Sequence, residues 1–190
     1  MRQTKPVRIG ILGEIRAGKD TVSQIISHEL SKLDGSRETN FFAFANGIHE
    51  VIKVTMPEVY SLGKPRKELQ HIGQALRQIK PDVWIDMLFN SQEYIWAKNF
   101  GHNLLITDVR QPNEAKRLQE QGFKIIKVTA FQHIRMQRAI DSGDNFNPDA
   151  FNHETELVIN QCPYDYEINN SFSIDFLESS VLRILGEVVK

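Results

Sequence analysis

The chain has 190 residues, which is typical of a single globular domain with its own core. It carries 23 lysines and arginines against 24 acidic residues, so there is no global positive field to hold a nucleic-acid polymer or an acidic membrane. The only cysteine, Cys162, cannot form an internal disulfide, and no cluster of cysteine and histidine has zinc-ligand spacing. Glu14 interrupts the N-terminal apolar run and no later segment approaches the length of a membrane span. We therefore expect a soluble, cytoplasmic protein with one domain over 1–190.

Short apolar runs alternate with amphipathic stretches along the chain, a pattern that predicts an α/β fold around a mainly parallel sheet. The first predicted helix follows the first strand and ends near residues 33–36. A shorter helix starts at Pro112 and stops at Gly122. The five predicted strands are residues 7–13, 40–45, 103–109, 123–130 and 165–170.

The stretch between the second and third predicted strands is too long for a plain crossover, so a helical insert is expected over about residues 46–100. Apolar residues at helical spacing predict two consecutive helices within it, at 63–80 and 81–100. Residues 141–156 are rich in Asp, Asn and Gly and lack periodicity, which indicates a mobile loop.

The segment GEIRAGK, from Gly13 to Lys19, follows a strand and opens a helix. In that context backbone N–H groups and the helix N-terminus can wrap a phosphate chain, and glycines permit the required φ angles. Lys19 would reach the β- and γ-phosphates of a nucleotide. The alternative is a chance glycine turn, but the order of strand, loop and helix favours a phosphate-binding loop.

Two acids are candidates for a metal site. A carboxylate at Asp20 would repel a triphosphate unless a divalent cation lay between them, so Asp20 makes sense as a direct or water-mediated Mg²⁺ ligand. The alternative is that Asp20 only complements the helix dipole. Thr21 keeps a hydroxyl nearby, and the sequence does not decide which of the two faces the metal. Asp108 ends the third strand, where the carboxyl ends of strands line a ligand crevice.

Three arginines complete the candidate catalytic set. Arg110 lies on the same rim as Asp108, and the alternative for it is a surface ion pair with Glu114. Arg135 and Arg138 lie on one helix face that leads into the loop at 141–156. They could close onto phosphates, or they could belong to a solvated basic face. Phosphoryl transfer needs mainly cations and positioning, and a phosphate-monoester acceptor needs no general base because it is largely dianionic at neutral pH.

Several segments, in this order, resemble the phage-type deoxynucleoside monophosphate kinases of the P-loop kinase superfamily. They are GEIRAGKDTV, LQHIGQALR followed by VWIDML, ITDVRQPNEAKRLQEQGFKIIKV, NHETE and YEINNSFSIDFL. The resemblance runs from about Ile9 to Leu177. It implies a three-layer α/β/α P-loop NTPase fold with a monophosphate-binding insert and a lid at about 131–156. The implied reaction transfers the γ-phosphate of ATP to a (deoxy)nucleoside monophosphate with Mg²⁺, in a monomer or homodimer.

The resemblance also implies roles for individual residues. Asp20 and Asp108 would lie near Mg²⁺, while Lys19, Arg110, Arg135 and Arg138 would serve catalysis. The NHETE element, with His153, Glu154 and Glu156, would help to position the lid. ATP would be held by Gly13, Arg16, Ala17, Gly18, Lys19, Asp20, Thr21 and Asn169, and the acceptor by Arg66, Gln70, Arg77 and Trp84.

Two other functions remain open from the sequence. The GKD loop and the G-x-x-x-R helix are also similar to animal-type phosphomevalonate kinases, so another phosphorylated small molecule is the alternative acceptor. From a different class, the chain could be a P-loop regulatory module that binds nucleotide without transferring phosphate. The arginines outside the loop and the long insert argue against a bare switch, because a switch needs neither.

Overall fold

The computed structural model describes residues 5–35, 37–63, 65–142 and 158–189. Its centre is a five-stranded, wholly parallel sheet in the order β2-β3-β1-β4-β5. The prediction of five strands in an α/β fold is therefore confirmed. The strands are β1 (Arg8–Gly13), β2 (Thr39–Phe42), β3 (Asn103–Val109), β4 (Lys124–Thr129) and β5 (Tyr166–Asn169).

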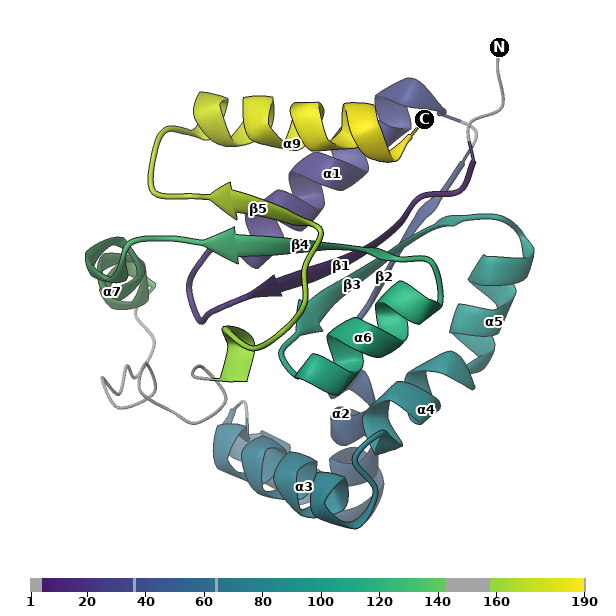
Figure 1. Cartoon of the computed structure of the whole chain (residues 1–190). Helices are drawn as coiled ribbons and strands as arrows, with labels where there is room; N and C mark the ends of the chain where they lie inside the picture. Colours follow the sequence, from purple (N-terminus) through teal and green to yellow (C-terminus); the bar gives the residue numbers. More distant parts are fainter. Residues whose placement is uncertain (1–4, 36, 64, 143–157, 190) are drawn as a thin grey trace.

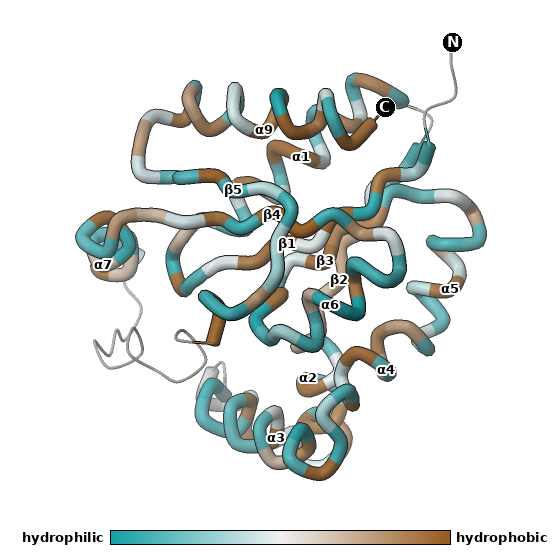
Figure 2. The backbone as a smooth tube through the Cα atoms, in the orientation of Figure 1, coloured by the Kyte–Doolittle hydropathy of each residue, from teal (hydrophilic) through white to brown (hydrophobic). Residues whose placement is uncertain are grey.

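Helices cover both faces of the sheet, which gives the expected three layers (Figure 1). Ile9 and Ile11 of β1 are fully buried against one face, in a core formed with α1 (Lys19–Leu33) and α9 (Ile174–Val188). Leu12, also fully buried, belongs to the core on the opposite face. Figure 2 shows this contrast along the chain, with many hydrophobic residues in β1 and mostly hydrophilic ones in the outer helix α6. The opposite layer contains α2 (Ala45–Thr55), α4 (Val83–Phe89), α5 (Gln92–Asn99) and α6 (Pro112–Glu120).

The insert begins earlier and contains more helices than the sequence predicts. β2 ends at Phe42, whereas the apolar run predicts a strand to residue 45. The backbone amides of Phe44 and Ala45 donate to the two carboxylate oxygens of Asp108, at 2.8 and 2.9 Å, and this contact starts α2. The 3-10 helix η1 (Pro57–Leu62) then leads to α3 (Arg66–Ile79), which packs on α2 and α4.

The predicted helix at 81–100 is wrong as a single element, because the chain forms α4 and α5 with a break between them. The Ser91 side chain accepts a hydrogen bond from the Tyr94 amide at 3.3 Å, which caps the start of α5. Serine at this position was therefore a readable helix-start signal. The short helix predicted from Pro112 is confirmed as α6, and Gly122 beyond its end has a φ of 81°.

The order of the strands locates the ligand crevice. The chain leaves β1 toward β2 on one side of the sheet and later crosses to β4 on the other, so the topology switches at β1. Open α/β sheets bind ligands outside the carboxyl ends of the strands at such a point. The helix α7 (Gln132–Asp141) lies beyond the carboxyl ends of β4 and β5 (Figure 1). The predicted loop and lid beyond residue 142, including His153, Glu154 and Glu156, lie outside the described residues.

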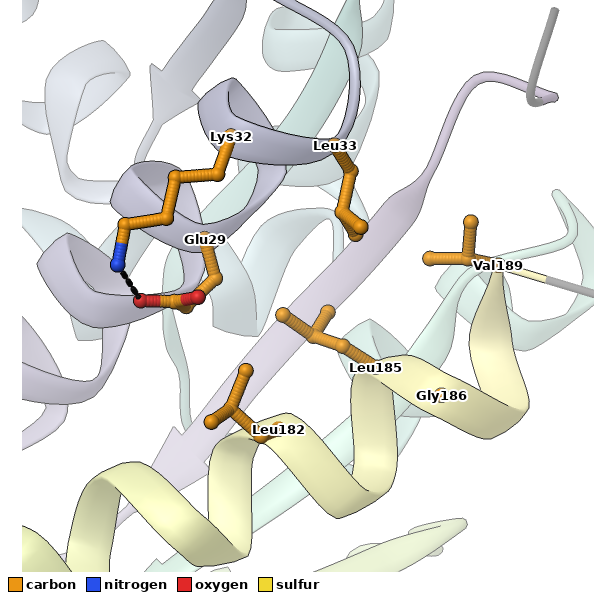
Figure 3. Close-up of a pocket in the computed structure, with 7 residues that line it drawn as sticks. All are labelled: Glu29, Lys32, Leu33, Leu182, Leu185, Gly186 and Val189. Atoms are coloured by element: carbon orange, nitrogen blue, oxygen red, sulfur yellow. Dashed lines mark hydrogen bonds and ion pairs between the residues drawn. The ribbon is translucent and has the colours of Figure 1, made fainter. Parts of the chain in front are cut away.

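An apolar groove lies between the C-terminal ends of α1 and α9 (Figure 3). It has a volume of about 340 Å³ and is lined by Leu33, Leu182, Leu185 and Val189, among others. Leu33 ends α1, so the groove lies about one helix length, roughly 20 Å, from the loop that starts this helix. It is therefore separate from the crevice. In the part of the chain that the structure describes, no helix combines the length and the apolar character needed to cross a membrane.

Candidate active site

The loop from Gly13 to Lys19 joins β1 to α1 at the topological switch point. Arg16 has a φ of 61°, a left-handed conformation that a non-glycine residue adopts at a cost and that clusters at ligand-binding sites. The Lys19 ammonium donates to the carbonyls of Gly13 at 2.8 Å and Glu14 at 3.0 Å. The lysine is therefore held inside the ring of the loop, where it would meet a bound phosphate chain.

Glycine is required at both ends of this loop for reasons of space. A Cβ at Gly13 would lie 2.5 Å from the carbonyl oxygen of Val128 on β4. A Cβ at Gly18, where φ is 95°, would collide with the Asn170 side chain. The loop is thus packed tightly against β4 and the segment after β5, and a larger residue at either position would push it out of place.

The two arginines of α7 contact this loop directly. Arg135 is 6% exposed and forms an ion pair with Glu14 at 3.1 Å. Arg138 donates to the carbonyls of Arg16 and Ala17, both at 3.3 Å, and to that of Asn170 at 2.8 Å. The alternative of a solvated basic face is therefore wrong for both arginines. Glu14 has no signal of its own in the sequence as the partner of Arg135.

The segment after β5 contacts the phosphate loop through Asn170 rather than Asn169. Asn170 is 6% exposed, and its amide nitrogen donates to the Ala17 carbonyl at 2.9 Å. The Asn169 side chain instead accepts the backbone N–H of Ser171 at 3.1 Å. The resemblance implies Asn169 as the ATP contact, and alternation along the strand does not reveal that its neighbour Asn170 is the one that points at the loop.

An exposed aromatic surface lies beside the same segment. The ring centroids of Phe131 and Phe172 are 6.0 Å apart, and those of Phe172 and Phe176 are 5.2 Å apart. His133 stacks on Phe131, and these two residues with Gln132 and Met136 line a shallow, open hollow. No pattern in the sequence predicts this surface, because scattered aromatics in a chain carry no periodic signal.

Asp108 lies at the end of β3 and is engaged by the start of α2 through the Phe44 and Ala45 amides. Burial raises the pKa of this carboxyl, while those two amide hydrogen bonds and the charges of Arg110 and Lys19 lower it. Because the charge of Lys19 lowers this pKa, Asp108 and Lys19 are close enough to interact electrostatically. Asp108 thus stands where the sequence predicts an acid beside the phosphate site.

The residues fit a magnesium ion of the kind that nucleotide enzymes use. Asp20 and Thr21 are exposed in the first turn of α1, and each offers oxygen ligands. Mg²⁺ is usually held by one or two carboxylates plus phosphates and waters, not by a full protein cage. The described residues contain no group of three or more His, Cys, Asp or Glu side chains placed to hold a metal ion. Asp20 is the accessible acid, whereas the Asp108 oxygens already accept two hydrogen bonds.

The insert brings Arg77 to the rim of the sheet. Arg77 Nη2 donates to Glu114 Oε1 at 3.1 Å, while Glu114 Oε2 accepts the backbone amides of Arg110 and Gln111 at 2.9 and 3.0 Å. Burial raises the pKa of Glu114 to about 7, with Arg77 lowering it and Asp108 raising it. The alternative for Arg110, a surface ion pair with Glu114, is therefore wrong, because Glu114 is buried, forms its ion pair with Arg77 and meets Arg110 through the backbone amide.

The other predicted acceptor residues differ in exposure. Arg66 and Gln70 are exposed on α3. Trp84 is only 1% exposed, and its indole N–H donates to the Gly73 carbonyl at 3.1 Å. In this conformation Trp84 therefore fastens α4 to α3 and leaves no surface for an acceptor to touch, which changes its expected role from contact to support.

Comparison with known proteins gives a likeness in structure alone. No family model and no curated protein matches the sequence. Among solved structures, shikimate kinase from Acinetobacter baumannii has a TM-score of 0.54 and 14% identity, covering 97% of this chain and 96% of that one. Shikimate kinase from Bacteroides thetaiotaomicron has a TM-score of 0.52 and 16% identity, covering 95% and 97%. Dephospho-CoA kinase from Campylobacter jejuni has a TM-score of 0.51 and 13% identity, covering 95% and 96%. The fold is therefore that of the P-loop kinases.

Proposed function

We propose that the protein is an ATP-dependent kinase that transfers the γ-phosphate of ATP to a (deoxy)nucleoside monophosphate. One observation carries this proposal: cationic side chains approach the switch point of the sheet from three separate elements, α1, α7 and α3. Lys19 and the α7 arginines gather on the phosphate loop, and Arg77 reaches the β3 rim from the insert. A two-substrate phosphotransferase needs one cationic site for the donor and another for the acceptor.

The donor side is built for the phosphates of ATP. Lys19 and the N-terminal amides of α1 would bind them, and the ATP base would lie toward Asn169 and the aromatic surface of Phe131 and Phe172. Aromatic rings that are exposed next to a phosphate loop give a base a stacking partner. Arg135 and Arg138 would stabilise charge on the transferring group once the phosphates replace the loop carbonyls as their partners.

The acceptor side would bind a phosphate monoester. Arg77 is half-buried, with 24% of its side chain exposed, and a guanidinium matches a phosphate through two parallel hydrogen bonds. Arg66 and Gln70 on the same helix are exposed and would contact the nucleoside, while Trp84 supports the helix from within. Arg110 lies on the rim between the two sites, next to Asp108.

The chemistry asks little beyond charge and position. The acceptor phosphate is largely dianionic at neutral pH, so its attacking oxygen has no proton to give up. Asp20 and Asp108 would hold Mg²⁺, which supplies neutralisation of the charge on the phosphate oxygens. Lys19, Arg110, Arg135 and Arg138 would supply the remaining positive charge.

The test is ADP release from ATP and Mg²⁺ against a panel of deoxy- and ribonucleoside monophosphates, phosphomevalonate, and no acceptor. Turnover with one or more nucleoside monophosphates is the expected result, and it gives the base preference. Turnover with phosphomevalonate alone would move the acceptor to another class of phosphorylated molecule. ATP binding with no acceptor-dependent turnover would favour a regulatory module and overturn the proposal.

A further inference from the structure

Glu114 divides its two carboxylate oxygens between two elements of the crevice. Oε2 accepts the backbone amides of Arg110 and Gln111, and so fixes the turn between β3 and α6. Oε1 accepts Arg77 Nη2, which comes from α3 in the insert. Helix capping alone would need only the first of these contacts, as in an ordinary capping box. The second contact reaches 37 residues back along the chain to a cation of the insert.

Gly73 lies on the face of α3 that carries the same guanidinium. It lies one helical turn before Arg77, and a Cβ built there would be 3.4 Å from Arg77 Nη1, an ordinary van der Waals distance, and 3.0 Å from Ile48 Cδ1, which is tight. The absence of a side chain therefore lets α3 pack closely on Ile48 of α2. The Trp84 indole holds the carbonyl of Gly73 from the other side. These two contacts position α3, the helix that brings Arg77 to Glu114.

We propose that Glu114 is a positioning residue that holds the Arg77 guanidinium in place for the phosphate of the acceptor. The ligand assigned to Arg77 rests on the proposed function, whereas the positioning itself does not. An arginine side chain has several rotatable bonds, and ordering them on binding reduces affinity. A buried carboxylate that orders the guanidinium in advance removes part of this cost, so its loss should weaken acceptor binding and spare ATP binding.

The kinetic test compares Glu114→Gln, Arg77→Ala and the double variant. Glutamine keeps the size of the side chain and one oxygen for the backbone amides but loses the charge. The expected result is an acceptor KM raised about tenfold or more in each single variant, with the Kd for ATP unchanged. The double variant should match Arg77→Ala, because Glu114 acts through Arg77. Glu187→Gln, which removes an exposed ion pair on α9, is the matched control and should behave like the wild type.

Additive effects in the double variant would overturn the proposal, as would an unchanged KM in Glu114→Gln.

Rotation of the Arg77 guanidinium in the unliganded protein, followed by ¹⁵N NMR, gives a second readout that needs no substrate. It should be slow in the wild type and faster in Glu114→Gln, and equal rates in the two would overturn the positioning role. If Glu114→Gln does not fold, Glu114→Asp replaces it, because the shorter side chain keeps the charge but draws the carboxylate back from Arg77, which should speed the rotation. Wild-type protein without acceptor-dependent turnover would refute the proposed function, while the NMR result would still decide the role of Glu114.

Discussion

The two sides of the crevice are held together in different ways. On the donor side, contacts gather on the backbone carbonyls of one short loop: Lys19 binds Gly13 and Glu14, and Arg138 binds Arg16 and Ala17. On the acceptor side, two carboxylates join distant segments, of which Glu114 is buried and Asp108 is half-buried. Asp108 holds the start of α2, and Glu114 joins α3 to the β3 rim.

This difference predicts which substitutions change turnover and which also change the free energy of unfolding. The donor loop uses cations whose removal costs charge at the reaction centre but leaves few buried groups without partners. The acceptor side uses acids that satisfy backbone amides, and removing such an acid strands those amides. Substitutions on the donor side should therefore act on turnover, whereas those on the acceptor side should act on both turnover and folding.

The largest effect is expected from Lys19→Ala. Loss of the loop ammonium should reduce kcat by roughly 100- to 1,000-fold, the scale seen when one preorganised charge-stabilising donor is removed. Urea unfolding should show a free energy of unfolding close to that of the wild type, because the two carbonyls it releases can be hydrated in the loop. A large loss of stability with the kinetic loss would contradict the contrast between the two sides.

Asp108→Asn should damage both properties. Asparagine keeps one acceptor oxygen for the start of α2 and turns an N–H group toward the second amide, so one backbone donor loses its partner. The expected loss in the free energy of unfolding is about 1 to 3 kcal/mol. Urea denaturation of the wild type, Asp108→Asn and Lys19→Ala under the same conditions measures this loss. Stability equal to that of Lys19→Ala would show that the carboxylate does not hold α2.

A smaller effect, specific to the metal, is expected from Asp20→Asn. If the exposed carboxylate helps to hold Mg²⁺, activity should fall by about tenfold and recover in part when the Mg²⁺ concentration is raised. Titration of kcat/KM with Mg²⁺ for the wild type and the variant makes the comparison. Identical Mg²⁺ dependence in the two proteins would favour the helix-dipole role for Asp20.

The last expected effect is a pH dependence of stability that comes from Glu114. Its pKa is about 7 in the folded protein against an ordinary value of 4.5, so between these values the unfolded chain releases a proton that the folded chain retains. The free energy of unfolding should therefore fall as pH rises through this window, more steeply in the wild type than in Glu114→Gln. The charged groups that act on Glu114 are Arg77 of α3 and Asp108 of the β3 rim, while Arg110 contacts it through its backbone amide. Burial and Glu114 raise the pKa of the nearby Cys162 thiol to about 12, so this group stays neutral in the window. Urea unfolding at about pH 5 and about pH 7.5 tests the slope, and parallel curves for the two proteins would contradict it.

The sequence predicts best what is local. Apolar runs locate all five strands to within a few residues, and the phosphate loop is readable because its glycines, lysine and flanking elements are adjacent in the chain. The end of β2 is not readable, because Ala43, Phe44 and Ala45 continue an apolar run and only a distant carboxylate turns them into a helix. The role of Trp84 is equally invisible, since its burial depends on how α3 and α4 pack.

In the candidate site, too, the sequence predicts local features and misses those that depend on contacts between distant segments. Lys19, Arg135 and Arg138 stand where a local motif and helical spacing predict, and all three contact the loop. Glu14, Asn170 and Glu114 owe their positions to contacts between elements that are far apart in sequence. A single sequence contains no pattern that pairs Arg77 with Glu114, although a buried partner for a half-buried arginine is a general expectation.

Transfer of labelled phosphate from [γ-³²P]ATP by the wild-type protein tests the central claim most directly. With Mg²⁺ and the panel of deoxynucleoside monophosphates, label should appear as the second phosphate of a nucleoside diphosphate, and Lys19→Ala should slow its appearance by the same roughly 100- to 1,000-fold. Label found only as inorganic phosphate, or retained entirely in ATP with every nucleoside monophosphate, would contradict an acceptor site built by the insert and with it the proposed kinase.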